Sequence, residues 1–287
     1  MHPILFKIGG LTFYTYGLIM AIAFITAYFY LLRLAKVSGQ DVEFYSNLFF
    51  WLMIFGILGA KALYLTVDWR SFTSNVKDVV GCIRGGLVWY GGVLADLGFV
   101  YYYARKHKKS YAQLADTVAG PGMVGLGIGR WGCLMAGCCY GKACSLPWAI
   151  VYPFLEDKRL QNPLAGIPVH PSPIYESLAD FAIALIAYAV FRRTKKKGLV
   201  MPLVIMLYAA VRFSLEFLRG DILRGFVISD KISTSQFISL LIFIPALAVF
   251  IRQLRKPPAP EPELKLVPKV NEQKGKKNKK NKGKEQK

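Results

Sequence analysis

An arginine, Arg130, lies inside a glycine-rich apolar segment, GLGIGRWG at 125–132. An arginine near the centre of a lipid bilayer costs about 2.5–3.5 kcal/mol on insertion scales. A membrane protein keeps such a charge mainly to bind an anion or to pair with another buried charge. Because Arg130 has no partner within its own predicted helix, the segment indicates an intramembrane site for a negatively charged substrate. Phospholipid head groups are the obvious candidates.

Other ionisable residues fall in predicted membrane segments. Arg212 and Glu216 are four residues apart, which places them on one helix face, and Arg219 follows one turn further toward the outer side. The Arg212–Glu216 pair either fixes helix packing or belongs to the substrate site. Lys61, in the second apolar block, either binds substrate or extends its amine to the membrane edge near Asp68.

Glycines and tyrosines give a second signal. Gly91 and Gly92 permit either close helix approach or a backbone that contacts a ligand. Tyr90, directly before them, and Tyr16, in FYTYGL, either line the site or belong to an interfacial aromatic belt.

Five cysteines are expected on the outer, oxidising side of the membrane, and four of them cluster after Arg130. Structural disulfides are the favoured interpretation, with a reactive thiol as the alternative. We expect no metal site, because the cluster has no CxxC pair and His170 is the only nearby histidine. The odd number leaves at least one sulfur unpaired or paired between chains. The cysteines are Cys82, Cys133, Cys138, Cys139 and Cys144.

The elements that must position these residues are long apolar blocks in a chain of 287 residues that is 54% apolar. Each block can cross a hydrocarbon core of about 30 Å as a helix. We therefore predict an all-α polytopic membrane protein with about seven transmembrane helices. The blocks are 15–32, 46–67, 87–104, 114–137, 173–191, 199–218 and 236–251.

Basic loops predict the orientation. Lys and Arg concentrate after the first, third and fifth blocks and beyond residue 252, so these regions are expected in the cytoplasm. The N-terminus then faces out and the C-terminus faces in, which requires an odd number of spans. The net charge of +20 reflects this bias and the basic tail, and it does not indicate a nucleic-acid partner. No cleavable signal peptide is expected, because no small-residue cleavage site follows a short apolar core.

Residues 1–252 are predicted to form one transmembrane domain. Within it, 138–171 contains four prolines and is expected to form an irregular outward-facing cap. The helix after this cap is expected to have Ser172 as its N-cap and Pro173 as its first residue. The Lys-rich segment 253–287 is predicted to be a disordered cytoplasmic tail that contacts anionic lipid, with an RNA or ribosome contact as the alternative.

Several motifs together resemble the prolipoprotein diacylglyceryl transferase family of bacterial inner-membrane enzymes, in the family's order. Three positions of its glycine–arginine signature differ: Cys133 and Ala136 replace asparagines, and Cys138 replaces a glutamate. Tyr90 stands at the family's histidine, and Lys61 at an arginine. The matching motifs are YGL at 16–18, GAKALY at 59–64, RGGLVWYGG at 84–92, GxGRxG at 127–132 with Gly141 beyond it, HPSPIYE at 170–176, RFSLEFLR at 212–219 and SxSQFISL at 233–240.

The resemblance implies transfer of the diacylglyceryl group of phosphatidylglycerol to the lipobox cysteine of preprolipoproteins, in the inner membrane of a bacterium. No cofactor is expected, because the sequence contains no nucleotide-binding or metal motif. We expect Arg130 and Arg212 to hold the phosphate, because arginines stabilise charge that develops on a leaving group. Arg219 is expected nearer the outer entrance, and Glu216 is expected to orient Arg212. His170 and Tyr90 are the candidate bases. Further substrate contacts are expected from Tyr16, Lys61, Gly91, Gly92 and Gly141.

Two other functions fit the same residues. A non-catalytic protein that binds or moves phospholipid would use the same arginines. A membrane thiol–disulfide enzyme would use Cys138 and Cys139, although adjacent cysteines form strained disulfides and no quinone or partner-cysteine pattern accompanies them.

Overall fold

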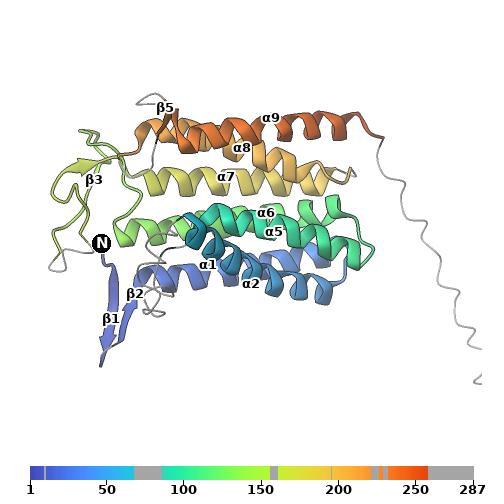
Figure 1. Cartoon of the computed structure of the whole chain (residues 1–287), viewed down its shortest axis with the longest axis horizontal. Coiled ribbons are helices and arrows are strands. Elements are labelled where there is room, and N and C mark those ends of the chain that lie inside the picture. The colour runs from blue at the N-terminus through green and yellow to red at the C-terminus, as the bar shows by residue number, and fades with distance from the viewer. Residues whose placement is uncertain are drawn as a thin grey trace, which may run out of the picture.

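The computed structural model describes residues 1–9, 11–67, 86, 88–155, 161–194, 196–220, 226–228 and 232–257. These residues form seven α-helices, one short 3-10 helix and six short strands (Figure 1). The helices are α1 (Thr15–Val37), α2 (Val42–Val67), α5 (Trp89–Lys106), α6 (Tyr111–Ala136), α7 (Ser172–Arg193), α8 (Val200–Leu215), η1 (Glu216–Leu218) and α9 (Thr234–Arg255). The strands pair as hairpins: β1 (Ile4–Ile8) with β2 (Leu11–Tyr14), β3 (Ile150–Val151) with β4 (Pro168–Val169), and β5 (Phe226–Ile228) with β6 (Ile232–Ser233).

The helical membrane fold predicted from the sequence is confirmed. Five helices are long and apolar enough to cross a membrane: α1, α2, α7, α8 continued by η1, and α9. The other two, α5 and α6, do not meet that standard of length and apolar composition. Arg105 and Lys106 end α5, and α6 contains several glycines as well as Asp116 and Arg130.

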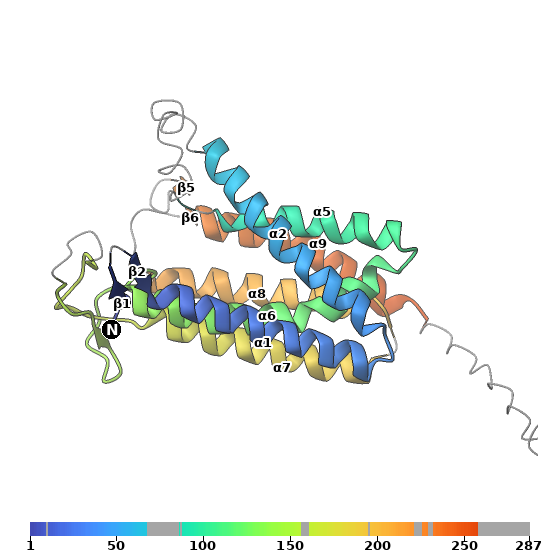
Figure 2. The same cartoon turned by 90° about the horizontal axis from the view of Figure 1, so that it is seen from below.

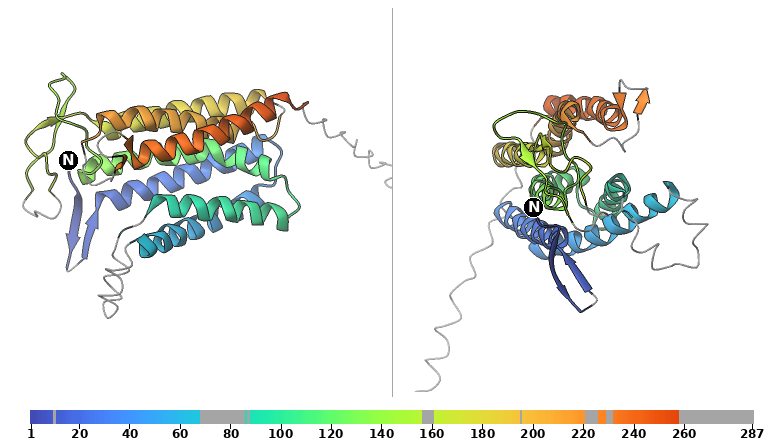
Figure 3. Two further views of the ribbon diagram at one scale, coloured as in Figure 1. Left: turned by 45° about the horizontal axis from the view of Figure 1, so that its top comes forward. Right: turned by 90° about the vertical axis from the view of Figure 1, so that its left-hand side faces the viewer.

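The polar composition of α6 is explained by its place in the bundle. This helix packs against α1, α7, α8 and α5, and the end-on view in Figure 3 shows it between its neighbours. Twelve of its residues are buried, among them Asp116 and four glycines. Its neighbours therefore cover much of α6, so a strongly apolar surface is not required on its covered side.

Large apolar side chains cover the outside of the bundle, as expected for a surface in contact with lipid. Phe29 of α1 is 64% exposed, Leu185 of α7 is 71% exposed and Ile244 of α9 is 67% exposed. These exposures are typical of a protein that lies in a membrane rather than in water.

Local signals define the helix ends. Ser110 caps α6 by accepting a hydrogen bond from the Gln113 amide, and Gly137 ends α6 with a left-handed φ of 73°. Ser233 and Gln236 form a reciprocal capping box at α9. The predicted Ser172 cap of α7 is wrong by one residue, because Pro171 is the N-cap and Ser172 is already helical.

Helices α2 and α5 approach closely at glycines. A Cβ atom on Gly91 would overlap the Gly59 carbonyl oxygen, and one on Gly92 would lie 2.8 Å from the Gly56 carbonyl oxygen. Both glycines therefore permit the close packing of α2 against α5. Figure 2 shows α2 crossing the bundle at an angle, beside α5.

The segment between α6 and α7 lies at the same end of the bundle as the β1–β2 hairpin, and the chain leaves α9 at the opposite end (Figures 1 and 2). The regular elements among its described residues are the two-residue strands β3 and β4. The predicted tail lies outside the described residues from 258 onward.

Candidate functional site: an arginine–carboxylate cluster

Three arginines from different elements converge on one carboxylate, Glu176 of α7. Arg130 Nη1 of α6 lies 2.8 Å from Glu176 Oε2. Arg212 Nη1 of α8 lies 3.4 Å from Glu176 Oε1, and Arg219 Nη1 donates to the same oxygen at 2.6 Å. The predicted site arginines are thus brought together, and Glu176 is the group that joins them.

The helix ends that carry these residues suit their charges. Glu176 is in the second turn of α7, near the positive end of that helix dipole, and Arg212 is in the last turn of α8, near a negative end. Arg130 lies six residues before the end of α6, roughly 9 Å from it. The cluster therefore lies toward the end of the bundle where 138–171 is found, rather than at its centre.

Arg212 contacts three polar side chains, one of which is Glu176. Its Nη2 atom lies 2.8 Å from Glu216 Oε2, which confirms the pair predicted from the four-residue spacing. The same nitrogen donates to Ser235 Oγ of α9 at 3.0 Å. Arg212 therefore connects α7, α8 and α9 through one guanidinium group, whose several donors in fixed geometry make this possible.

Burial makes these charges dependent on one another. The exposed fractions of the side chains are 14% for Arg130, 11% for Arg212, 3% for Arg219 and 4% for Glu176. A charge buried to this degree is strongly destabilising unless a partner compensates it. Loss of Glu176 would leave three guanidinium groups without their shared counter-charge.

The cluster is not fully hydrogen-bonded. Among the described residues, Arg130 Nε, Glu176 Oε2 and Asp180 Oδ2 are buried and make no hydrogen bond. The 2.8 Å contact between Arg130 and Glu176 is thus an ion pair without the alignment of a hydrogen bond. Because native proteins satisfy most buried polar atoms, unsatisfied donors and acceptors that meet in one place are typical of a ligand site.

Glu176 and Asp180 were not among the site residues predicted from the sequence. Asp180 Oδ2 lies 4.0 Å from Arg130 Nε, and its side chain is 2% exposed. Glu176 and Asp180 are one turn apart on the buried face of α7, which continues through Ala184 and Ala187. Two acidic residues at that spacing inside an apolar helix were the signal that could have found them.

Side chains between α6 and α7 fix the cluster's geometry. Ser177 Oγ donates to the Gly127 carbonyl at 2.8 Å and accepts from Trp131 Nε1 at 3.1 Å. Both bonds flank Arg130 along α6, and Ser177 is adjacent to Glu176. The register that places Arg130 opposite Glu176 is therefore set by direct contacts between the two helices.

Backbone hydrogen bonds connect the segment after α6 to Arg219 and His170. Gly141 forms an isolated antiparallel bridge with Arg219, and the Gly141 amide donates to the His170 carbonyl at 3.1 Å. A Cβ atom on Gly141 would lie 2.5 Å from His170 Cβ, so no larger residue fits without a shift. His170 Nδ1 itself lies 3.5 Å from Tyr175 Oη. Gly141 thus holds this segment close to Arg219.

The remaining predicted residues lie in other contacts. Lys61 Nζ of α2 lies 3.5 Å from the Gly86 carbonyl oxygen and 5.0 Å from the centre of the Tyr64 ring. Tyr90 is half-buried in the first turn of α5. Tyr16 of α1 packs against Gly132 of α6, where a Cβ atom would lie 2.9 Å from its ring. The residue of α6 that Tyr16 contacts, Gly132, is therefore two residues from Arg130.

The four described cysteines are free thiols, so the favoured disulfides are not formed among them, and Cys82 lies outside the described residues. The Cys138 thiol donates a hydrogen bond to the Cys133 carbonyl oxygen at 3.6 Å.

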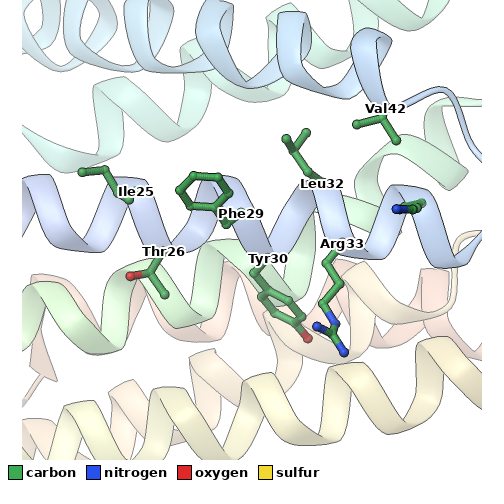
Figure 4. Close-up of a pocket in the computed structure, with 8 residues that line it drawn as sticks. Ile25, Thr26, Phe29, Tyr30, Leu32, Arg33 and Val42 are labelled. Carbon is green, nitrogen blue, oxygen red and sulfur yellow. The ribbon is translucent and has the colours of Figure 1, made fainter.

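A groove of about 630 Å³ lies along the outside of α1, well away from the arginine cluster (Figure 4). Most of its lining is apolar, and Arg33 and Lys36 lie at one end of it. Arg33 is 17 residues from Tyr16 along α1, which is roughly 25 Å of helix. None of the predicted site residues lines this groove.

Fold and cluster together define a helical membrane protein with a buried arginine–carboxylate site near one end of its bundle. The family model for "Prolipoprotein diacylglyceryl transferase" matches residues 3–252, and the chain belongs to this family. A phosphatidylglycerol–prolipoprotein diacylglyceryl transferase of Clostridium tetani is 35% identical over 89% of this chain and 100% of that protein. A second enzyme of that name from Clostridium perfringens is 33% identical over 87% of this chain and 94% of its own length. One from Idiomarina loihiensis is 32% identical over 90% of this chain and 95% of its own length.

Proposed function

We propose that this protein transfers the diacylglyceryl group of phosphatidylglycerol to the lipobox cysteine of a preprolipoprotein, the first step of lipoprotein maturation. Membership of the family and the names of its relatives support this assignment. The observation that carries it for this chain is the convergence of Arg130, Arg212 and Arg219 on Glu176.

The reaction requires charge stabilisation more than it requires a strong base. The acceptor sulfur attacks the glycerol carbon that bears the phosphate, the carbon–oxygen bond breaks, and a thioether forms as glycerol phosphate leaves. Negative charge on the leaving phosphate is what Arg130 and Arg212 would stabilise. The Nε atom of Arg130, buried without a hydrogen-bond partner among the described residues, supplies a donor for a phosphate oxygen.

The thiol proton must be removed, and His170 is our preferred acceptor. Its backbone is held against Gly141, which bridges to Arg219, so the imidazole belongs to the same end of the protein as the arginines. Tyr90 remains the second candidate. A free thiol has a pKa near 8.5, and nearby guanidinium groups favour its ionised form. Tyr16, Lys61, Gly91, Gly92 and Gly141 remain proposed substrate contacts, and Glu216 would orient Arg212.

We further propose that all seven helices cross the bacterial inner membrane, with the N-terminus and 138–171 outside and the C-terminus in the cytoplasm. Burial of α6 among its neighbours supports a polar span. In this orientation the arginine cluster lies in the outer part of the membrane, where the lipobox of a translocated signal peptide would meet phosphatidylglycerol.

The experiment is a transfer assay with purified protein in nanodiscs that contain phosphatidylglycerol. A lipobox peptide and its cysteine-to-serine variant serve as acceptors, and both glycerol phosphate and peptide mass are measured. Release of glycerol phosphate together with a diacylglyceryl adduct, only with the cysteine peptide, is the expected result. Lipid-dependent thermal stabilisation without release would instead indicate a lipid-binding protein. Activity that needs Cys138 and Cys139 but tolerates Arg130→Ala would indicate a thiol–disulfide enzyme.

A further inference from the structure

Three thiols meet at the C-terminal end of α6. Cys133 is in the last turn of the helix, and Cys138 and Cys139 follow Gly137, the residue that ends it. The three Sγ atoms all lie within 4.8 Å of one another. Cys144, the fourth described cysteine, is not part of this group.

The backbone conformation of the turn after α6 brings these thiols together. Gly137 adopts a left-handed conformation, and the Cys138 amide then donates to the Cys133 carbonyl oxygen at 3.1 Å. Cys139 also has a positive φ, 59°. Such a conformation costs a non-glycine residue about 1 kcal/mol or more, so it persists only where the surroundings impose it.

This conformation is imposed by neighbouring segments of the chain. Beyond Cys139, the Lys142 amide donates to the Leu218 carbonyl oxygen at 2.8 Å, and the Gly220 amide donates to the Tyr140 carbonyl oxygen at 3.1 Å. These bonds fix the chain on one side of the thiols, and α6 fixes it on the other. The cluster is thus held at both ends.

We propose that Cys133, Cys138 and Cys139 bind one thiophilic metal ion of the zinc class as three thiolates. Zinc–sulfur bonds are about 2.3 Å, which places the sulfurs of a tetrahedral site about 3.8 Å apart. The sulfurs already lie within 4.8 Å, so each must move by less than an ångström to close around an ion. Three protein ligands leave one position of the tetrahedron open to water or to another thiol.

Access and charge both favour such an ion. Cys138 is exposed while Cys133 and Cys139 are half-buried, so an ion can enter from one side and be held from the other. Binding a divalent ion displaces three thiol protons and gives the site a net charge of −1. The Arg219 guanidinium, whose positive charge acts on Cys139, offsets that charge.

This inference departs from the expectation of no metal, which rested on the absence of a CxxC pair. The spacing here is Cys-x4-Cys-Cys. The chain reverses its direction at Gly137 and so brings the three thiols together, which the spacing alone does not reveal. The inference concerns binding only and stands apart from the proposed transfer reaction.

The test is a Cd²⁺ titration of the reduced full-length protein in nanodiscs, read by the thiolate-to-cadmium charge-transfer absorbance. We expect one ion per chain, displacement by Zn²⁺, and release of about three protons. Cys138→Ser and Cys139→Ser should each weaken binding at least tenfold, whereas Cys144→Ser should leave it unchanged. Thermal melting of each variant without metal establishes that it is folded, and exposed Cys138 is the substitution least able to disturb folding.

Two results would overturn the proposal. One is Cd²⁺ binding of the same affinity and stoichiometry in Cys138→Ser, Cys139→Ser and Cys144→Ser, which would place the ion elsewhere. The other is a wild-type chain that binds no Cd²⁺, whether thiol counting finds the three cysteines free or mass spectrometry without reductant finds two of them joined as a disulfide.

Discussion

Glu176 Oε1 of α7 accepts a 2.6 Å hydrogen bond from Arg219 Nη1, and both side chains are almost completely buried. Arg219 belongs to the segment after α8 that bridges to Gly141. A single carboxylate in the membrane bundle therefore fixes a residue of the segment after α8, while its other contacts hold Arg130 and Arg212. Through Glu176, the packing of α7 determines where all three guanidinium groups lie.

Glu176→Gln should reduce transfer by about 100-fold or more, because an amide keeps the size of the side chain but cannot balance three guanidinium charges. The measurement is the initial rate of diacylglyceryl transfer at several phosphatidylglycerol concentrations. Glu43→Gln, at an exposed carboxylate near the start of α2, is the matched control and should leave the rate unchanged. A Glu176→Gln rate within threefold of wild type would show that the shared carboxylate is dispensable.

Arg212→Lys should lower activity by about 10- to 100-fold, although the charge is kept. The guanidinium reaches Glu176 through Nη1 and both Glu216 and Ser235 through Nη2, and a lysine amine cannot reproduce this geometry. The rate of glycerol phosphate release measures the effect. Ser235→Ala removes only one neutral partner and should change that rate by less than about threefold. Equal losses in the two variants would contradict this account.

Asp116→Ala should destabilise the protein by about 2 kcal/mol or more. The buried Asp116 carboxylate of α6 accepts hydrogen bonds from the amides of Gly198 at 2.6 Å, Leu199 at 3.2 Å and Met201 at 2.9 Å, and so caps α8 from another helix. Thermal unfolding in detergent measures the effect.

Asp41→Ala is the control for the Asp116 variant. Asp41 accepts amide hydrogen bonds from Glu43 and Phe44 at the exposed start of α2, so its loss should cost only about 0.5–1 kcal/mol. If the Asp41 variant unfolds at the same temperature as the Asp116 variant, burial of the cap is not what makes Asp116 important.

Gly91→Ala should disturb the contact between α2 and α5, because its Cβ atom would overlap the Gly59 carbonyl oxygen. We expect a lower unfolding temperature, in line with an overpacking cost of about 1–3 kcal/mol. Gly98→Ala, on the same helix with nothing within 4 Å of its added atom, should be neutral or slightly stabilising. A Gly91 variant as stable as the Gly98 variant would mean that the two helices can separate without cost.

Features that depend on residues close together in the sequence were predicted, and features that depend on contacts between distant residues were not. The helices and the Arg212–Glu216 pair depend on apolar blocks and on spacing within one helix, and these were predicted. Glu176 and Asp180 acquire their importance from α6 and α8, which lie far away in the sequence. From the sequence, Gly91 could serve either helix packing or contact with a ligand. Its packing role becomes visible only when Gly59 of α2 is seen opposite it.

The most direct test of the account compares diacylglyceryl transfer to a lipobox peptide by wild type, Arg130→Ala and Arg33→Ala. Arg130 pairs with Glu176 inside the bundle, whereas Arg33 lines the outer groove of α1 and serves as the control for loss of one arginine. The account predicts that Arg130→Ala loses transfer by about 100-fold or more while remaining folded, and that Arg33→Ala keeps it. Wild-type transfer retained by folded Arg130→Ala would contradict the central claim that the arginine–carboxylate cluster is the site of reaction.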